Sequence, residues 1–269
     1  MKEEQTTGFY LTFENGILFK QLIDLCKEIL TDINLEILED GIHMQSMDMS
    51  HVSLINFFLS KESFKYYHVS SPTTIALSLK SLSTVLKCYK NEFDLSFSSK
   101  DNNTDVLDII MLRKMTTDTK TLENNKQQQY TFSLNLMSID QEYLSIPNED
   151  AHCTIIMEAS DFCDCIKNIS SIGNDLELKT VGKLVEFNVI GDIGKVSMCE
   201  TFSKKNMTFT KMDNYTLRLS MRYLQTFCKG NFFSKMVELR IREEQPLQMR
   251  YEIENGSFLE FYLAPKFDD

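Results

Sequence analysis

The sequence predicts an α+β fold built from two similar domains, each an antiparallel sheet carrying two helices. Three observations favour this class. Most of the chain alternates apolar and polar residues at period two, four segments have helical spacing instead, and the order of these segments repeats. Equivalent segments lie about 140 residues apart, so we infer an internal duplication of architecture.

The period-two runs are typical of half-buried antiparallel strands, because Asn, Gly and Asp separate one run from the next. In the first half we expect strands at 33–38, 42–47, 52–59, 64–69, 74–79, 93–97, 106–112 and 130–136. In the second half we expect strands at 153–157, 176–178, 184–189, 195–199, 214–219, 236–241, 247–253 and 258–263.

Four segments, 16–30, 79–90, 159–172 and 219–229, carry apolar residues at helical spacing. Their expected core faces are, in order, Leu18, Leu22, Leu25 and Ile29; Leu79, Leu82, Leu86 and Tyr89; Phe162, Cys165, Ile166, Ile169 and Ile172; and Met221, Leu224, Phe227 and Cys228. The polar stretch 113–129 has no periodicity, and we interpret it as an exposed loop.

The joint between the two halves falls at 136–152, a stretch that holds Pro147, one of only four prolines. We therefore expect a first domain over 1–135, a connecting segment over 136–152 and a second domain over 153–269. Each half then reads strand, helix, several strands, helix and several strands.

The composition is that of a globular protein, with 42% hydrophobic and 11% aromatic residues in a chain of 269. Nine glycines and four prolines are too few for a disordered chain. Residues 1–10 lack the apolar run of a signal peptide, and no run approaches the roughly 18 apolar residues of a membrane span. These features predict a soluble intracellular protein with no membrane partner.

The seven cysteines and four histidines form no recognisable metal-binding or catalytic pattern. Cys163 and Cys165 are the close pair, but helix positions two apart point in different directions. The histidines lack HxxxH and HExxH spacing, and no nucleophile–base set or phosphate-binding glycine loop is present. We expect no enzyme activity, no metal and no cofactor, and ordinary core or surface positions for Cys and His.

Basic residues gather on the polar faces of the expected helices, although the net charge is −11. Residues seven apart share a helix face, and this spacing recurs on the first, second and fourth helices. Surface helices often carry lysines outward, but recurrence at matched places favours contacts with phosphates that do not read bases. The residues are Lys20, Lys27, Lys80, Lys87, Lys90, Lys167, Arg222 and Lys229.

Several motifs resemble the proliferating cell nuclear antigen family, the eukaryotic DNA sliding clamps. The longest is DGIHMQSMDMSHVSL at 40–54, and the chain nears its end with YLAPK at 262–266. Shorter matches occur in the family's order: VLKC at 85–88, LMSID at 136–140, LSIP at 144–147, IG at 172–173, RYL at 222–224 and QPL at 245–247.

The resemblance implies a homotrimer, closed head to tail into a ring with sheets outside and helices inside. The basic residues would face a hole that encircles double-stranded DNA without reading its sequence. Such a clamp would tether DNA polymerase and other replication or repair proteins, and an ATP-dependent clamp loader would open it. The resemblance also implies a nuclear location, or a viral replication compartment if a virus encodes the chain.

The resemblance further implies an apolar pocket beneath the connecting segment for a short peptide of partner proteins, of the pattern Gln-x-x-aliphatic-x-x-aromatic-aromatic. The matching positions are Met47, His51, Val52, Leu54, Leu144, Ile146, Pro147, Pro246, Tyr262, Ala264 and Pro265. The acidic Glu149 and Asp150 of the connecting segment are expected to meet basic residues that flank the peptide.

Two alternatives stay open: a subunit of a checkpoint-type or specialised clamp, and a clamp-like scaffold that does not encircle DNA. The chain also departs from the family at the helices. Phe19 stands where the first helix usually has a lysine, and Thr84, Asp164 and Ser171 replace basic residues. We therefore expect DNA contact to be weaker or differently distributed than in typical members.

Overall fold

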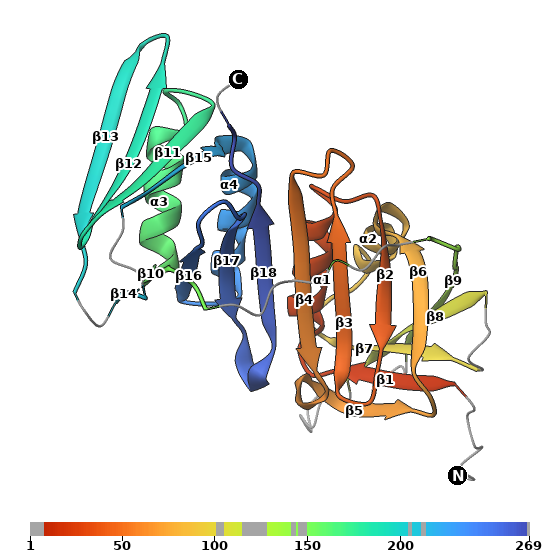
Figure 1. Ribbon diagram of the computed structural model, residues 1–269. Coiled ribbons are helices and arrows are strands. Elements are labelled where there is room, and N and C mark those ends of the chain that lie inside the picture. Colours follow the sequence, from red (N-terminus) through yellow and green to blue (C-terminus); the bar gives the residue numbers. More distant parts are fainter. Residues whose placement is uncertain are drawn as a thin grey trace, which may run out of the picture. The chain divides into compact units, whose positions relative to one another are not determined.

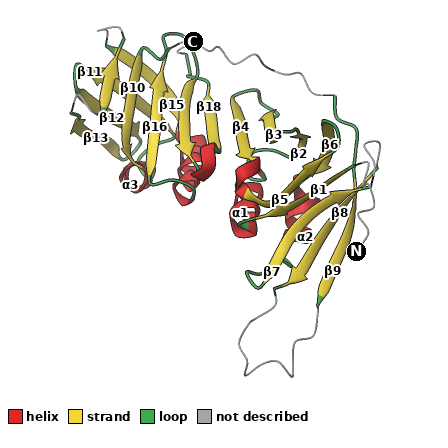
Figure 2. Ribbon diagram, turned by 90° about the horizontal axis from the view of Figure 1, so that it is seen from below, coloured by secondary structure: helices red, strands yellow, loops and turns green. Residues whose placement is uncertain are grey.

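The computed structural model describes residues 8–100, 105–114, 128–140, 144, 150–203, 206–210 and 214–267. The chain divides into two compact units. Unit 1 comprises Met1–Ser46, Phe58–Glu142 and Asn255–Ser257, and unit 2 comprises Met47–Phe57, Tyr143–Glu254 and Phe258–Asp269. In its described part, each unit combines antiparallel strands with two α-helices, which confirms the predicted α+β class (Figures 1 and 2).

Unit 1 contains two sets of antiparallel strands. One sheet has the order β5-β1-β7-β8-β9, made of β5 (Phe64–Val69), β1 (Phe9–Phe13), β7 (Phe93–Ser99), β8 (Val106–Arg113) and β9 (Gln129–Asn135). In the other set β2 (Asp32–Ile37) lies between β3 (Gly41–Met47) and β6 (Thr73–Ser78). The strand β4 (Ser53–Ser60) is divided between the two units, because its residues up to Phe57 belong to unit 2 and those from Phe58 belong to unit 1.

The helices of unit 1, α1 (Gly16–Cys26) and α2 (Leu79–Leu86), pack against each other (Figure 1). The predicted core face of α2 is confirmed, whereas the face of α1 is partly wrong, since Leu18 and Ile29 are only half buried. Phe19 faces the core instead, fully buried against Phe13 and Phe97 with ring centroids 4.4 and 5.2 Å away. Phe19 is therefore part of the core and not of the exposed face of α1.

Unit 2 also contains two sets of antiparallel strands. One sheet has the order β13-β12-β11-β15, made of β13 (Gly194–Thr201), β12 (Leu184–Gly191), β11 (Asp175–Val181) and β15 (Tyr215–Ser220). The other runs in the order β14 (Met207–Phe209), β10 (Cys153–Glu158), β16 (Met236–Ile241), β17 (Leu247–Glu252) and β18 (Phe258–Leu263). The segment Met47–Phe57 lies beside β18, because the Ala264 amide donates to the Val52 carbonyl oxygen over 2.9 Å.

The helices of unit 2 are α3 (Ala159–Ile169) and α4 (Met221–Phe227), and a 3-10 helix, η3 (Cys228–Phe232), continues α4. Their predicted core faces are confirmed except at Ile172, which is half buried. Phe227 stacks on Phe261 at 4.3 Å between centroids. In η3 the absence of a side chain at Gly230 makes room for Tyr251. The nearest atom of the Tyr251 ring would lie 2.4 Å from a Cβ added at Gly230.

Every predicted strand is present, and the structure adds β1 and β14 and the short 3-10 helices η1 (Lys61–Ser63) and η4 (Glu254–Gly256). The strand β14 is only three residues long, too short to display a period, and its pairing with β10 defines it. All four α-helices are shorter than predicted. The last residues of the first three patterns form turns or irregular structure, those of the fourth form η3, and its first two residues, Leu219 and Ser220, belong to β15. Within the described residues, no helix is long and apolar enough to cross a membrane.

Candidate functional site

Unit 2 contains a cavity of about 380 Å³, called here the unit 2 pocket. It brings together residues from the Met47–Phe57 segment, from the turn between β16 and β17 and from the end of β18. Its lining consists of Met47, His51, Val52, Ser53, Leu54, Leu144, Arg242, Gln245, Pro246, Tyr262 and Ala264. An apolar concave surface with a few polar groups is the usual composition of a binding site.

Two residues expected at this pocket are not tested by the described part of the chain, and a third lines another cavity. Ile146 and Pro147 lie outside the described residues, as does Glu149. Pro265 does not line the pocket and instead lines a separate cavity of about 560 Å³ near β15 and Phe267. The remaining expected residues all contribute to the lining.

Asp48 organises the loop that leads into the pocket. Its carboxylate accepts hydrogen bonds from the backbone amides of Val52 and Ser53 at 2.9 and 2.6 Å and from the Tyr223 hydroxyl at 2.7 Å. Burial raises the pKa of Asp48, but these bonds and one from Ser50 outweigh it, so the pKa lies below its ordinary value.

The same loop holds His51 in the left-handed region, with φ of 57°. This conformation is unfavourable for a residue with a side chain, and it persists only where neighbouring contacts impose it. The hydrogen bonds of Asp48 on both sides of His51 supply such contacts. The loop therefore presents His51 and Val52 to the pocket in a fixed arrangement.

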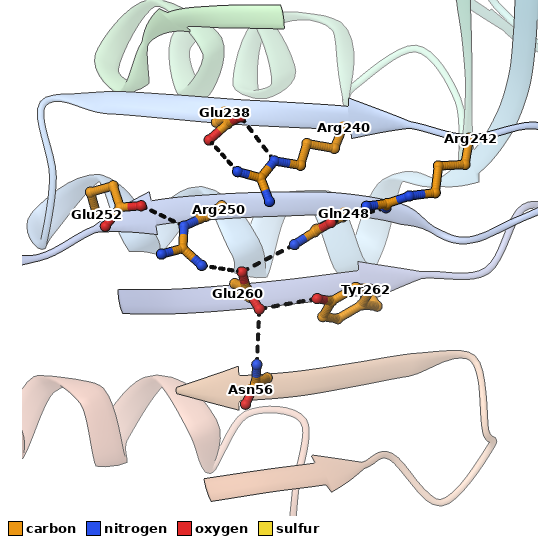
Figure 3. A network of polar contacts seen from close by, with 9 residues as sticks. All are labelled: Asn56, Glu238, Arg240, Arg242, Gln248, Arg250, Glu252, Glu260 and Tyr262. Carbon is orange, nitrogen blue, oxygen red and sulfur yellow. Dashed lines mark hydrogen bonds and ion pairs between the residues drawn. The ribbon is translucent and has the colours of Figure 1, made fainter. Parts of the chain in front are cut away.

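A buried polar network includes the lining residues Arg242 and Tyr262 and is centred on Glu260, which is 4% exposed (Figure 3). Glu260 accepts hydrogen bonds from the Tyr262 hydroxyl at 3.0 Å, from Gln248 at 3.0 Å and from Asn56 at 2.8 Å. Arg250 also donates to it, which compensates the buried charge. The donors come from three strands, β4, β17 and β18, so the network restricts the side chains on this face of the sheet.

The two pocket residues of this network, Arg242 and Tyr262, are joined to it through neighbouring side chains. Arg242 donates a hydrogen bond to Gln248 at 3.0 Å, and Gln248 stands opposite Tyr262 in the register of β17 and β18. Burial and the charge of Glu260 raise the pKa of Tyr262, so its hydroxyl keeps its proton at neutral pH. These hydrogen bonds restrict the Arg242 and Tyr262 side chains before a ligand binds. Binding is favoured because less side-chain entropy is lost when the ligand binds.

Sequence reasoning missed Ser53, Arg242 and Gln245 as lining residues. Gln245 belongs to the QPL motif and could have been found there. Arg242 carries no such signal, because its place in the wall depends on the β16–β17 turn and on its bond to Gln248.

The residues of unit 1 that were expected to contact DNA fall into two kinds. Lys80, Lys87 and Lys90 are exposed on or just after α2, and Lys20 is half buried on α1. Lys27 is used inside the unit instead, with its Nζ 2.7 Å from Ser83 Oγ and 3.3 Å from Asp24 Oδ1. Its charge is thus already partly satisfied.

The three residues of unit 2 that were expected to contact DNA are all exposed. Lys167 lies on α3, Arg222 on α4 and Lys229 on η3. Lys167 and Lys229 line one cavity of about 260 Å³, to which Arg222 does not contribute. Over the described ranges, no group of three or more His, Cys, Asp or Glu residues is placed to hold a metal ion.

Comparison with known proteins finds two family models that match successive parts of the chain. The family model described as "Proliferating cell nuclear antigen, N-terminal domain" matches residues 9–143, and the corresponding C-terminal domain model matches residues 145–266. A relative named proliferating cell nuclear antigen 2, from Drosophila melanogaster, is 29% identical over 255 residues, covering 94% of this chain and 95% of the relative.

A second relative, the proliferating cell nuclear antigen of Chaetomium thermophilum, is 30% identical over 262 residues, covering 95% of this chain and 97% of the relative. Both family models match in the expected order, and together they account for nearly all of the sequence. The chain belongs to the proliferating cell nuclear antigen family of DNA sliding clamps.

Proposed function

We propose that this chain forms a homotrimeric ring that encircles duplex DNA and tethers DNA polymerase and other replication or repair proteins. Membership of the clamp family supports the general role, and the unit 2 pocket is the observation that carries the tethering. The clamp itself performs no catalysis, an ATP-dependent loader opens the ring, and the site of action is the nucleus or a viral replication compartment.

The unit 2 pocket supports capture of a short peptide with one aliphatic and two aromatic anchors. Met47, Leu54 and Tyr262 provide apolar walls, and Arg242 and Gln245 provide polar groups for the peptide backbone or side chains. Each buried anchor contributes roughly 1.5–3 kcal/mol before ordering costs are subtracted. Micromolar affinity follows, which allows different partners to exchange on one clamp.

Two edge strands support ring closure. The strands β9 and β13 stand at the ends of their sheets, and all of their residues are exposed or half buried. An open edge offers backbone N–H and C=O groups to another chain. Pairing of β9 in one subunit with β13 in the next is a heterologous contact of the kind that closes a ring.

The exposed cations on the helices support sequence-independent contact with DNA. The exposed residues of that set are Lys80, Lys87, Lys90, Lys167, Arg222 and Lys229. We assign them contacts with phosphates that do not read bases. A topologically closed ring needs no tight contact, and weak phosphate contacts permit sliding. Because Lys27 is engaged by Asp24 and Ser83, we assign it a smaller share.

The test combines solution mass with titration of a fluorescent peptide that carries the Gln-x-x-aliphatic-x-x-aromatic-aromatic pattern. We expect a mass of three chains, loading onto circular DNA and saturable micromolar binding. The double variant Met47→Ala with Leu144→Ala should weaken peptide binding by about tenfold or more without changing the mass.

The matched control is Met49→Ala. Met49 lies in the same loop but is 86% exposed and does not line the pocket, so binding should change less than about twofold. A chain that remains monomeric at micromolar concentration and cannot be loaded onto circular DNA would contradict the ring. Charge reversal of Lys20, Lys87 and Lys229 should abolish processivity, and unchanged processivity would favour the scaffold alternative.

A further inference from the structure

Two thiols from distant parts of the sequence meet where α3 packs on η3 in unit 2. Cys163 lies in the first half of α3, and Cys228 ends α4 and begins η3. The Cys163 thiol donates a hydrogen bond to the backbone oxygen of Cys228, with an Sγ–O distance of 3.0 Å. The helix packing thus holds the two residues together although 65 positions separate them.

A cavity of about 260 Å³ opens beside these two residues, here called the thiol pair. Its described lining consists of Cys163, Ile166, Lys167, Gln225, Cys228, Lys229 and Asn231. The charged groups in that lining are Lys167 and Lys229, while the carboxylate of Asp164 on α3 also acts on Cys163 and opposes its ionisation. A water molecule occupies about 30 Å³, so the cavity has room for a small oxidant beside the two cysteines.

The thiol pair also has the protonation pattern of a reactive dithiol. A hydrogen bond from the Cys228 side chain lowers the pKa of Cys163 below its ordinary value, although burial and Asp164 oppose this. The same contact and burial raise the pKa of Cys228. Of the two thiols, Cys163 therefore has the lower pKa and ionises first, and its neighbour Cys228 stays protonated until the second step.

The other buried thiols of the chain lack this pattern. Burial raises the pKa of Cys26 and Cys153 to about 12 and that of Cys165 to about 11. Such thiols remain protonated at neutral pH and react slowly. Proximity in sequence is therefore misleading, because Cys165 is the neighbour of Cys163 along the chain but Cys228 is its chemical partner.

We propose that Cys163 and Cys228 form a redox-active dithiol that a peroxide converts into an intramolecular disulfide. The Cys163 thiolate attacks one peroxide oxygen, the O–O bond breaks, and Cys163 becomes a sulfenic acid as hydroxide leaves. The Cys228 thiol gives its proton to this hydroxide, which becomes the first water molecule, and the resulting thiolate attacks the Cys163 sulfur. The S–S bond forms as the S–O bond breaks, and the hydroxide that leaves takes up the proton that Cys163 lost on ionising, which gives the second water molecule. In total, two thiols and one hydrogen peroxide give one disulfide and two water molecules.

The disulfide would lie beside Lys167 and Lys229, two of the cations proposed to contact DNA. The chemistry itself needs neither DNA nor a ring, so it goes beyond the proposed function and can be tested separately. A thiol reductant would reverse the reaction, which makes the site a candidate for reversible modification.

The experiment uses the full chain with the exposed Cys88 and Cys199 replaced by serine, to suppress links between molecules. It is treated with hydrogen peroxide at pH 7, the remaining thiols are alkylated, and the peptides are mapped by mass spectrometry. We expect a cross-link between peptides containing residues 163 and 228, a loss of two hydrogen atoms in intact mass, and full reversal by dithiothreitol.

Single substitutions separate the two steps. Cys228→Ser should stop the reaction at a Cys163 sulfenic acid that dimedone traps. Cys163→Ser should slow oxidation of Cys228 by at least about tenfold, because the activated thiolate is gone. The matched control is Cys165→Ser, which should leave the cross-link and its rate within about twofold.

One measurement needs no substitution at all. In the unaltered chain, iodoacetamide labelling of Cys163 should show a pH midpoint below the roughly 8.5 of an ordinary free thiol. Absence of the 163–228 cross-link, its loss in Cys165→Ser, or a labelling midpoint at or above that value would overturn the proposal.

Discussion

The two helix pairs stand at equivalent places in the repeated order of elements, yet different chemistry joins them. In unit 1, Asp24, Lys27 and Ser83 form a polar bridge between α1 and α2. Ser83 Oγ donates to Asp24 Oδ1 and lies within hydrogen-bond distance of Lys27 Nζ, at 2.7 Å in both cases. In unit 2, the corresponding helices meet through the thiol pair, Cys163 and Cys228.

This difference teaches that duplication fixes where helices lie but not what joins them. The polar bridge engages Lys27, a residue that helical spacing in the sequence predicted to contact DNA. The thiol pair lines one cavity together with Lys167 and Lys229, which are both exposed. We therefore expect the polar bridge to contribute mainly stability and the thiol pair to contribute mainly reactivity.

The comparison of the two junctions depends first on which face of α1 is buried. Among the variants considered, Phe19→Lys is expected to have the largest effect on stability. A lysine at this fully buried position would place a charge against Phe13 and Phe97. We expect a loss of about 4 kcal/mol or more in the free energy of unfolding, measured by urea denaturation with circular dichroism.

Leu18→Lys provides the control, because Leu18 is adjacent on the same helix and only half buried. It should cost less than about 1 kcal/mol. If Phe19→Lys were as stable as Leu18→Lys, Phe19 would lie on the exposed face after all. Lys27 would then turn away from α2, and the polar bridge could not form.

The two junctions should next differ in what they contribute to stability. Ser83→Ala removes the buried hydroxyl that joins Asp24 to Lys27, and we expect a cost of about 1.5 kcal/mol. Cys163→Ala removes one weak sulfur hydrogen bond, with an expected cost of about 0.5 kcal/mol. Urea midpoints of the two variants test this order, and a larger cost for Cys163→Ala would reverse it.

The smallest effect concerns DNA and compares Lys27→Met with Lys87→Met. Lys87 is exposed, so its loss should weaken duplex binding by roughly threefold to tenfold and reduce the salt dependence of binding. Lys27→Met should change binding less than about twofold and should instead lower the urea midpoint slightly. Equal effects of both variants on DNA binding would show that the polar bridge opens when DNA is present.

The pocket shows how far sequence reasoning reaches towards a site. Its expected residues came from motifs at 40–54, 144–147, 245–247 and 262–266, and the described ones meet around one cavity except Pro265. Arg242 escaped notice because a charged residue near a strand end usually faces solvent. Its burial depends on Gln248 and, through it, on Glu260 two strands away.

The sequence by itself determined the alternation of the strands, the helix positions, the duplication and the family. These properties depend on local side-chain periodicity and on ordered motifs, which are present in the chain before it folds. Only the tertiary structure decided that Phe19 is core, that Lys27 binds Ser83 and that Cys163 meets Cys228. The physical reason is that the last two contacts join residues 56 and 65 positions apart, so helix packing and not sequence spacing creates them.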